Sequence, residues 1–164
     1  MKVEIRNKAG YSFIVNMDKN TRLYPHFRLF ELANNEGDTN IPQMLLTPES
    51  DEFMLLVEQL RCWWDKPMNC NSNYRQRAYN KRVGGSSNSL HLEALAFDWP
   101  VILTYAQRIA VYNQWMDITR RAGKIGGINF YPWGLHIDAN EDKFGYKHFV
   151  IRNGKTVVQS VPRP

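Results

Sequence analysis

Apolar residues recur at helical spacing in two long stretches of the chain, each behind a helix-capping signal. The first begins at Thr47 and Pro48 and is predicted to end near Trp64. Its apolar positions lie three or four residues apart, at Phe53, Val57, Leu60 and Trp64. The second begins at Thr104 and ends at Gly123. The side chains predicted to share its inner face are Ile109, Tyr112, Met116 and Thr119.

Shorter patterned segments lie between and around these two helices. Short helices are predicted at 27–32 and 74–83, a polar loop at 33–42, and a flexible loop at Gly84-Gly85-Ser86-Ser87. Strands are predicted within 3–15, with a turn at 7–10, and at 66–72, 128–131, 135–139, 148–152 and 155–161. The last two flank Asn153-Gly154, which favours a type I′ hairpin turn. Most neighbouring strands are expected to be antiparallel, so the predicted fold class is α+β.

The length and composition are those of one globular domain spanning residues 1–164. Of the 164 residues, 43% are hydrophobic and 23% charged, which excludes collagen-like, coiled-coil and wholly disordered chains. The net charge of +5 favours anionic partners such as nucleic acid, cell-wall polymers or membrane surfaces. No apolar run reaches 18 residues, and we expect no stable membrane association.

The N-terminal segment and the cysteines indicate a product made in the cytoplasm. Residues 1–15 mix charged residues into the apolar ones and lack the apolar core of a signal peptide. Cys62 and Cys70 are too far apart for a C-x-x-C motif. In a reducing compartment both are predicted to be buried thiols, without a redox or metal-binding role.

Two histidines and an aspartate have the composition of a catalytic zinc site. His91, Asp98 and His136 would leave one coordination position open, where water can bind and lose a proton near neutral pH. His91 and Asp98 are an odd number of residues apart, so a single straight strand would place them on opposite faces. We therefore expect His91 in a loop and Asp98 on a strand that Pro100 ends. The spacing alone is equally compatible with three residues that do not share a site.

The residues around this group closely resemble a known series of motifs. They are Ser72-Asn73-Tyr74-Arg75, the segment from Asn88 to Asp98, Gly126-Gly127-Ile128-Asn129-Phe130-Tyr131-Pro132, and Leu135-His136-Ile137-Asp138. In this order they resemble the S-G-Y-R, S-x-H-x-x-G-x-A-x-D, G-G-x-G-x-Y-P and H-x-D patterns of the zinc D-Ala-D-Ala carboxypeptidase and murein endopeptidase family. That family belongs to a superfamily with lysostaphin-type peptidases and the Hedgehog domain. The resemblance is strongest over 27–138.

This resemblance implies a fold and a set of roles. It implies a small antiparallel sheet that carries the metal site and is flanked by helices, with one zinc ion held by His91, Asp98 and His136. It also implies that Arg75 binds a substrate carboxylate or carbonyl, for which a guanidinium fork is suited. Ser89, two residues before the first ligand, is expected to position its loop. For Gly126 and Gly127 we expect a tight turn.

Three departures from the family pattern bear on the fold and on the chemistry of the site. Asn73 and Ala94 stand where the family has glycine. Trp133 stands where many members carry the carboxylate of the general base, and it is expected either to line the substrate groove or to pack. The nearest remaining carboxylate is Asp138, which acts either as the general base or as an orienting partner of His136. The alternative role for Arg75 is a surface ion pair without contact to substrate.

The implied activity is hydrolysis of amide bonds in peptidoglycan stem peptides by a monomeric zinc peptidase. Because Trp133 replaces the carboxylate of the general base, an alternative function is a zinc-containing cell-wall-binding domain that does not cleave. A nucleic-acid-binding module is a further alternative, although no recognised nucleic-acid motif is present. It is suggested by basic residues beside two tyrosines, namely Arg75, Arg77, Lys81 and Arg82 beside Tyr74 and Tyr79. The absence of a signal peptide favours a phage endolysin that reaches the wall through a holin, or else a cytoplasmic recycling enzyme.

Overall fold

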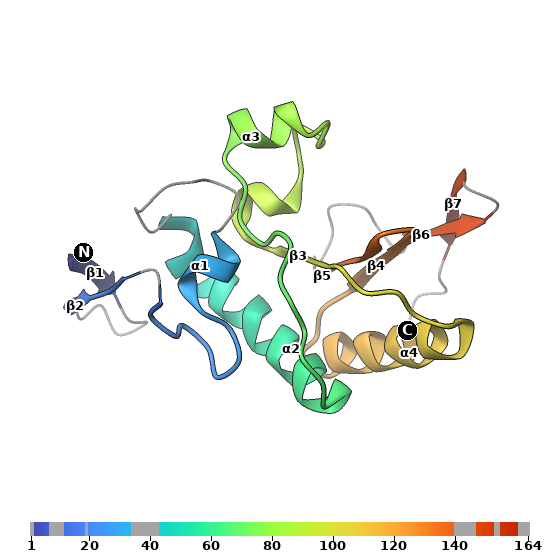
Figure 1. Ribbon diagram of the computed structural model, residues 1–164, viewed down its shortest axis with the longest axis horizontal. Helices are drawn as coiled ribbons and strands as arrows, with labels where there is room; N and C mark the ends of the chain where they lie inside the picture. Colours follow the sequence, from blue (N-terminus) through green and yellow to red (C-terminus); the bar gives the residue numbers. More distant parts are fainter. Residues whose placement is uncertain are drawn as a thin grey trace.

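Helices and strands alternate along the chain in an α+β arrangement, which confirms the predicted fold class (Figure 1). The computed structural model describes residues 2–6, 12–18, 20–33, 43–139, 147–152 and 155–160. The helices are α1 (Leu29–Leu32), α2 (Pro48–Trp64), α3 (Arg77–Arg82) and α4 (Tyr105–Arg121), with 3-10 turns η2 (Gln43–Leu46) and η3 (Leu90–Glu93). The strands are β1 (Lys2–Arg6), β2 (Ser12–Asn16), β3 (Ala96–Trp99), β4 (Gly126–Tyr131), β5 (Gly134–Ala139), β6 (Lys147–Arg152) and β7 (Lys155–Ser160).

A three-stranded antiparallel sheet of order β3-β5-β4 lies at the centre of the described fold. β5 is the middle strand, and its His136 lies directly opposite Asp98 on β3 and Asn129 on β4. Two further antiparallel pairs, β1 with β2 and β6 with β7, match the predicted hairpins at the two ends of the sequence. Their predicted turns at 7–10 and 153–154, and most of the predicted loop at 33–42, lie outside the described residues.

The two long helices support this sheet. α4 packs on β4, and α2 contacts α4 (Figure 1). Phe53 of α2 meets the indole of Trp115 of α4 edge to face, with ring centroids 6.2 Å apart. Trp115 is fully buried, and its Nε1–H donates to the carbonyls of Gly127 and Asp138 at 2.9 and 3.0 Å. α4 therefore holds β4 and β5 together at the level of Asp138.

Both long helices start at the predicted capping residues. Thr47 Oγ1 accepts a hydrogen bond from the Ser50 backbone at 3.2 Å, with Pro48 in the first helical position. Thr104 and Gln107 form a reciprocal capping box at the start of α4. Gly123 follows the end of α4 with a φ of +70°, a conformation that glycine adopts without steric cost.

Four predictions about local structure away from the metal centre are wrong. Residues 66–72 form no strand, because only a single bridge joins Ser72 to Asp98. α3 begins at Arg77 and not at 74, because the backbone N–H of Arg75 donates to the carbonyl of His91. Ile109 is exposed, and α4 buries Val111, Trp115, Ile118 and Thr119. Cys62 lies on the surface of α2, whereas Cys70 is buried as predicted.

None of the helices in the described part of the chain combines the length and apolar character needed to span a bilayer.

Candidate metal centre

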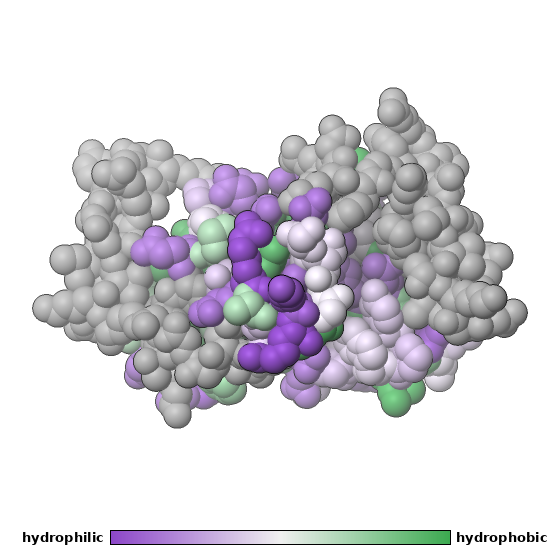
Figure 2. Space-filling model, turned by 90° about the horizontal axis from the view of Figure 1, so that it is seen from above, coloured by the Kyte–Doolittle hydropathy of each residue, from purple (hydrophilic) through white to green (hydrophobic). Residues whose placement is uncertain are grey.

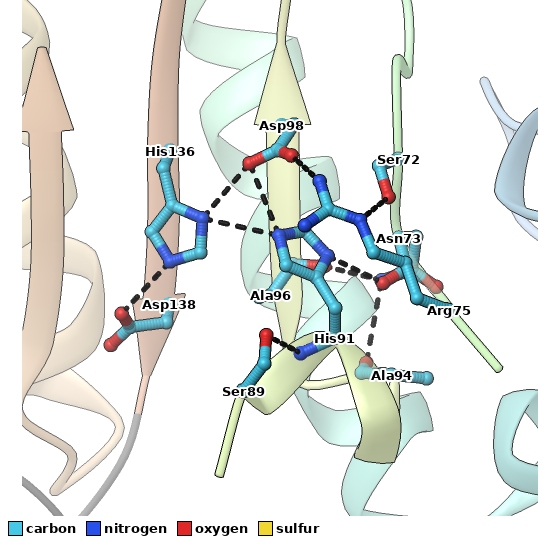
Figure 3. Close-up of polar contacts among 10 residues, drawn as sticks. All are labelled: Ser72, Asn73, Arg75, Ser89, His91, Ala94, Ala96, Asp98, His136 and Asp138. Carbon is cyan, nitrogen blue, oxygen red and sulfur yellow. Dashed lines mark hydrogen bonds and ion pairs between the residues drawn. The ribbon is translucent and has the colours of Figure 1, made fainter. Parts of the chain in front are cut away.

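Three elements bring the predicted ligands together. His91 lies in η3, Asp98 on β3 and His136 on β5 (Figure 3). Asp98 is on a strand and His91 lies off it as expected, although in a 3-10 turn and not in a loop. Asp98 and His136 lie next to each other because the antiparallel register pairs them across the two strands. η3 directly precedes β3 in the chain and places the His91 ring beside both residues.

The three donor atoms form a triangle of the size that a metal ion requires. His91 Nε2 lies 3.2 Å from Asp98 Oδ1 and 3.2 Å from His136 Nδ1, and His136 Nδ1 lies 2.9 Å from Asp98 Oδ1 (Figure 3). A tetrahedral ion with bonds of about 2.0–2.1 Å separates its ligands by about 3.3 Å. Two imidazoles and a carboxylate at this separation fit a zinc ion and leave its fourth position open.

Hydrogen bonds on the outer side of each ring fix which nitrogen faces the metal position. His91 Nδ1 lies 2.7 Å from the carbonyl oxygen of Asn73, which can only accept, so Nδ1 carries the proton and Nε2 carries the lone pair. His136 Nε2 lies 3.3 Å from Asp138 Oδ2, and donation to this carboxylate leaves Nδ1 for the metal. Each ring is thus held in the tautomer that a ligand needs.

Burial and charge act in opposite directions on the three ligands before a metal binds. Burial lowers the pKa of His91, which is almost fully enclosed. Burial alone would raise the pKa of Asp98, but hydrogen bonds with His136 and His91 outweigh it and place that pKa well below its usual range. For His136 burial lowers the pKa, yet hydrogen bonds with Asp138 and Asp98 raise it to about 9.

Arg75 is bonded to the candidate ligand Asp98 and to Ser72 beside it. Its Nη2 donates to Asp98 Oδ2, the oxygen that does not face the two histidines, and its Nε–H donates to Ser72 Oγ at 2.7 Å (Figure 3). The ion pair is mostly buried and is not the alternative surface pair. Arg75 therefore fixes the orientation of a ligand while its guanidinium lines the pocket described below.

The two departures from the family's glycines are accommodated together. Ala94 has a φ of +56° and takes up the left-handed conformation that glycine would favour. The buried Asn73 side chain donates to the carbonyls of Ala94 and Ala96 at 3.3 and 2.8 Å (Figure 3). Asn73 thus holds the left-handed turn between His91 and β3, while its own carbonyl orients the His91 ring.

The prediction of a tight turn at Gly126 and Gly127 is wrong, since both residues lie within β4. They are small because other groups approach their backbone closely. A Cβ at Gly127 would overlap the carboxylate of Asp138, and one at Gly126 would crowd Thr119 and Trp115. Gly127 therefore makes the space in which Asp138 can reach His136.

An open pocket of about 320 Å³ lies over the three ligands. Its lining residues are Arg75, Val83, Ser89, His91, Asp98, Tyr131, Trp133 and His136. Trp133 is 44% exposed and stacks on Tyr131, with centroids 5.1 Å apart and planes 9° from parallel. Ser89 Oγ accepts a weak bond of 3.4 Å from the His91 backbone and caps η3. Asp138 lies behind His136 and does not line the pocket.

Two contributors to the site were missed as functional residues. Tyr131 forms one wall of the pocket, and the Asn73 carbonyl sets the His91 tautomer. Tyr131 lies within a motif that the sequence displays, and its position two residues before Trp133 was the available signal. The Asn73 contact has no sequence signal, because a backbone carbonyl carries no residue identity.

The chain belongs to the Peptidase M15 family, whose profile matches residues 25–138. The matched range contains all three ligands, Arg75 and the pocket, and it confirms the resemblance seen in the motifs. Peptidases of this family are metal-dependent, and the group formed by His91, Asp98 and His136 can hold a metal ion. No curated protein and no solved structure matches the chain.

Proposed function

We propose that this protein is a zinc-dependent peptidase that hydrolyses amide bonds in peptidoglycan stem peptides. The observation that carries the proposal is the triangle of His91 Nε2, Asp98 Oδ1 and His136 Nδ1 at the base of an open pocket. Three protein ligands with an accessible fourth position are typical of catalytic zinc, whereas most structural zinc sites have four protein ligands. A zinc ion held there supplies Lewis-acid activation of a peptide carbonyl and of water.

The residues around the triangle support a role in holding a peptide. Arg75 presents its guanidinium to the pocket while its Nη2 is bonded to Asp98, so a carbonyl or carboxylate of the substrate can bind beside the metal ligands. The stacked rings of Tyr131 and Trp133 offer a flat wall against which an extended peptide can pack. Ser89 lies at the edge of the same pocket and keeps η3 in place.

Basic side chains on α3 support an anionic substrate. Hydrophilic side chains gather at the centre of the face seen in Figure 2, on the side of the molecule where Figure 1 places α3. Arg77 and Lys81 of α3 line a second hollow, of about 340 Å³, together with Ser87. Carboxylates of stem peptides match this positive charge, and the net charge of +5 favours contact with the anionic wall.

Asp138 is proposed as the orienting partner of His136 and not as the general base. Its carboxylate is bonded to His136 Nε2 and lies outside the pocket lining. Among the residues that line the pocket, Asp98 carries the only carboxylate. This feature favours one second candidate function, a zinc-containing wall-binding domain that does not cleave.

Metal analysis and wall digestion on the same samples test the two candidates. We expect purified protein to contain zinc and to release peptide fragments from muropeptides, and His91→Ala to lose hydrolysis together with the metal of this site. The fragment masses distinguish a carboxypeptidase, which removes a terminal D-Ala, from an endopeptidase. Metal bound at His91 without cleavage would establish the binding domain, and no metal at this site would overturn both candidates.

A further inference from the structure

A second group of metal-ligand side chains lies outside the peptidase pocket. His26 precedes α1, and Glu58 and Cys62 lie on α2. Each of the three offers one donor atom, and these atoms lie within 4.8 Å of one another. None of the three lines the pocket over His91, so the proposed hydrolysis does not use them.

The fold holds the three residues against one another. Glu58 and Cys62 are four residues apart on a 17-residue helix and so share one of its faces, one turn apart. His26 lies in a turn closed by backbone bonds between Phe27 and both Leu23 and Tyr24. Phe27 itself is fully buried and packs edge to face on Phe97 of β3.

Glu58 is an unusual residue for the inner part of a helix. Its side chain is only 8% exposed, and a buried carboxylate is costly unless it is paired. Both of its oxygens face His26: Oε1 accepts from the backbone N–H at 2.8 Å, and Oε2 lies 2.6 Å from the ring Nδ1. A buried carboxylate is thus aimed at an exposed imidazole with a thiol beside it.

The donor set selects the class of ion. A thiolate, an imidazole and a carboxylate together suit Zn²⁺ and other thiophilic divalent ions, whereas Mg²⁺ and Ca²⁺ prefer oxygen ligands. Cys62 and His26 are exposed, so an ion can reach them, and exposed side chains rotate rapidly enough to close on it.

We propose that His26, Glu58 and Cys62 form a second zinc site, separate from the peptidase centre, in which the three side chains hold the ion and solvent takes its fourth position. The ion joins the turn at His26 to α2 and stabilises the folded protein, because a ligand that binds only the folded state shifts the unfolding equilibrium. The proposal does not rest on the peptidase function. It also revises the prediction that Cys62 is a buried thiol without a metal-binding role.

Cobalt substitution separates the two sites, because the ligands at the peptidase centre include no sulfur. In the untagged full-length protein loaded with Co²⁺, we expect the absorption band of thiolate-to-cobalt charge transfer. Cys62→Ser should abolish the band, and the matched variant Cys70→Ser should keep it. His91→Ala should also keep it. Absence of the band in the parent protein, or its persistence in Cys62→Ser, overturns the proposal.

Zinc counting provides a second readout that does not depend on the optical band. We expect two zinc ions per chain in the parent and one in Cys62→Ser, with muropeptide hydrolysis unchanged because Cys62 lies outside the pocket. Equal zinc content in the two proteins contradicts the second site. A parent that shows the cobalt band without hydrolysis contradicts the peptidase proposal alone, so the two proposals fail separately.

Discussion

At the scale of single residues, the space at Gly127 decides how His136 is held. The Asp138 carboxylate occupies the volume that a Cβ at this position would need, and Asp138 in turn receives the His136 Nε2 hydrogen. We expect Gly127→Ala to weaken zinc binding by about 10–100-fold, the usual effect of losing an outer hydrogen-bond partner of a ligand. Competition with a chelator measures the affinity.

Gly126→Ala is the matched control for this effect. A Cβ at Gly126 would crowd Thr119 and Trp115 and not Asp138, so this variant should lose stability while it keeps its zinc affinity. If both variants lost metal equally, the effect would belong to β4 as a whole and not to Asp138.

Replacing Asp138 itself distinguishes its two candidate roles. Asp138→Asn retains an oxygen that can accept from His136 Nε2, whereas Asp138→Ala does not. If Asp138 orients the ring, zinc affinity and hydrolysis should fall together, and more in Asp138→Ala than in Asp138→Asn. Full zinc occupancy with hydrolysis lost in Asp138→Asn would instead assign the general base to Asp138.

Zinc binding is expected to strengthen as the pH rises toward about 9. In the metal-free protein Asp138 and Asp98 raise the pKa of His136 to about 9, so below this pH the ring carries a proton that the metal must displace. Each unit of pH below that value should weaken apparent affinity by up to about tenfold. Calorimetric titration at several pH values, with the proton release measured in two buffers, checks the slope. A flat profile would contradict proton competition at His136.

At the scale of elements, η3 and β3 depend on one buried side chain for their relative position. The Asn73 amide donates to the carbonyls of Ala94 and Ala96, which bracket the left-handed turn between His91 and Asp98. A glycine at 73 would restore the family pattern but remove both bonds. We expect Asn73→Gly to lower the free energy of unfolding by about 1–3 kcal/mol, as urea denaturation would measure. An unchanged unfolding midpoint would show that the amide contributes nothing to stability.

Elements with strong local signals could be predicted from the sequence, and those set by long-range contacts could not. The caps at Thr47 and Thr104 fix the starts of α2 and α4 because the capping bonds are local. The segment at 66–72 is predicted to be a strand, yet only Ser72 pairs with β3, across from Asp98. Helical periodicity placed Ile109 on the inner face of α4, where it is exposed, and missed the fully buried Val111 and Trp115, because what packs against a helix is decided by the tertiary fold.

For the site as a whole, motif resemblance assigned the residues, and the structure supplied their geometry. From their spacing alone, His91, Asp98 and His136 could be three unrelated residues or the ligands of one metal ion. The sheet register decides between these interpretations, because it places Asp98 beside His136. The close approach at Gly127 and the carbonyl contact of Asn73 depend on how strands and loops pack in three dimensions. Neither leaves a pattern in the order of residues, so the sequence predicts the ligands better than the groups that orient them.

At the scale of the whole molecule, the two cysteines should report on different events. Cys70 belongs to the hydrophobic core, and burial raises the pKa of its thiol well above the usual value. Cys62 is exposed on α2. In zinc-free native protein a thiol reagent should therefore modify Cys62 rapidly and Cys70 only when the core opens.

The labelling rate of Cys70 then measures the opening of the core. If the reaction of the exposed thiol with the reagent is slow compared with reclosing, the labelling rate divided by the rate in denaturant gives the equilibrium constant for opening. Cys62→Ser removes the fast phase and leaves one slow thiol, whose rate should rise with urea in parallel with the loss of folded structure. Rapid labelling of Cys70 in the native state would show that the packing around α2 and β3 opens locally, without global unfolding.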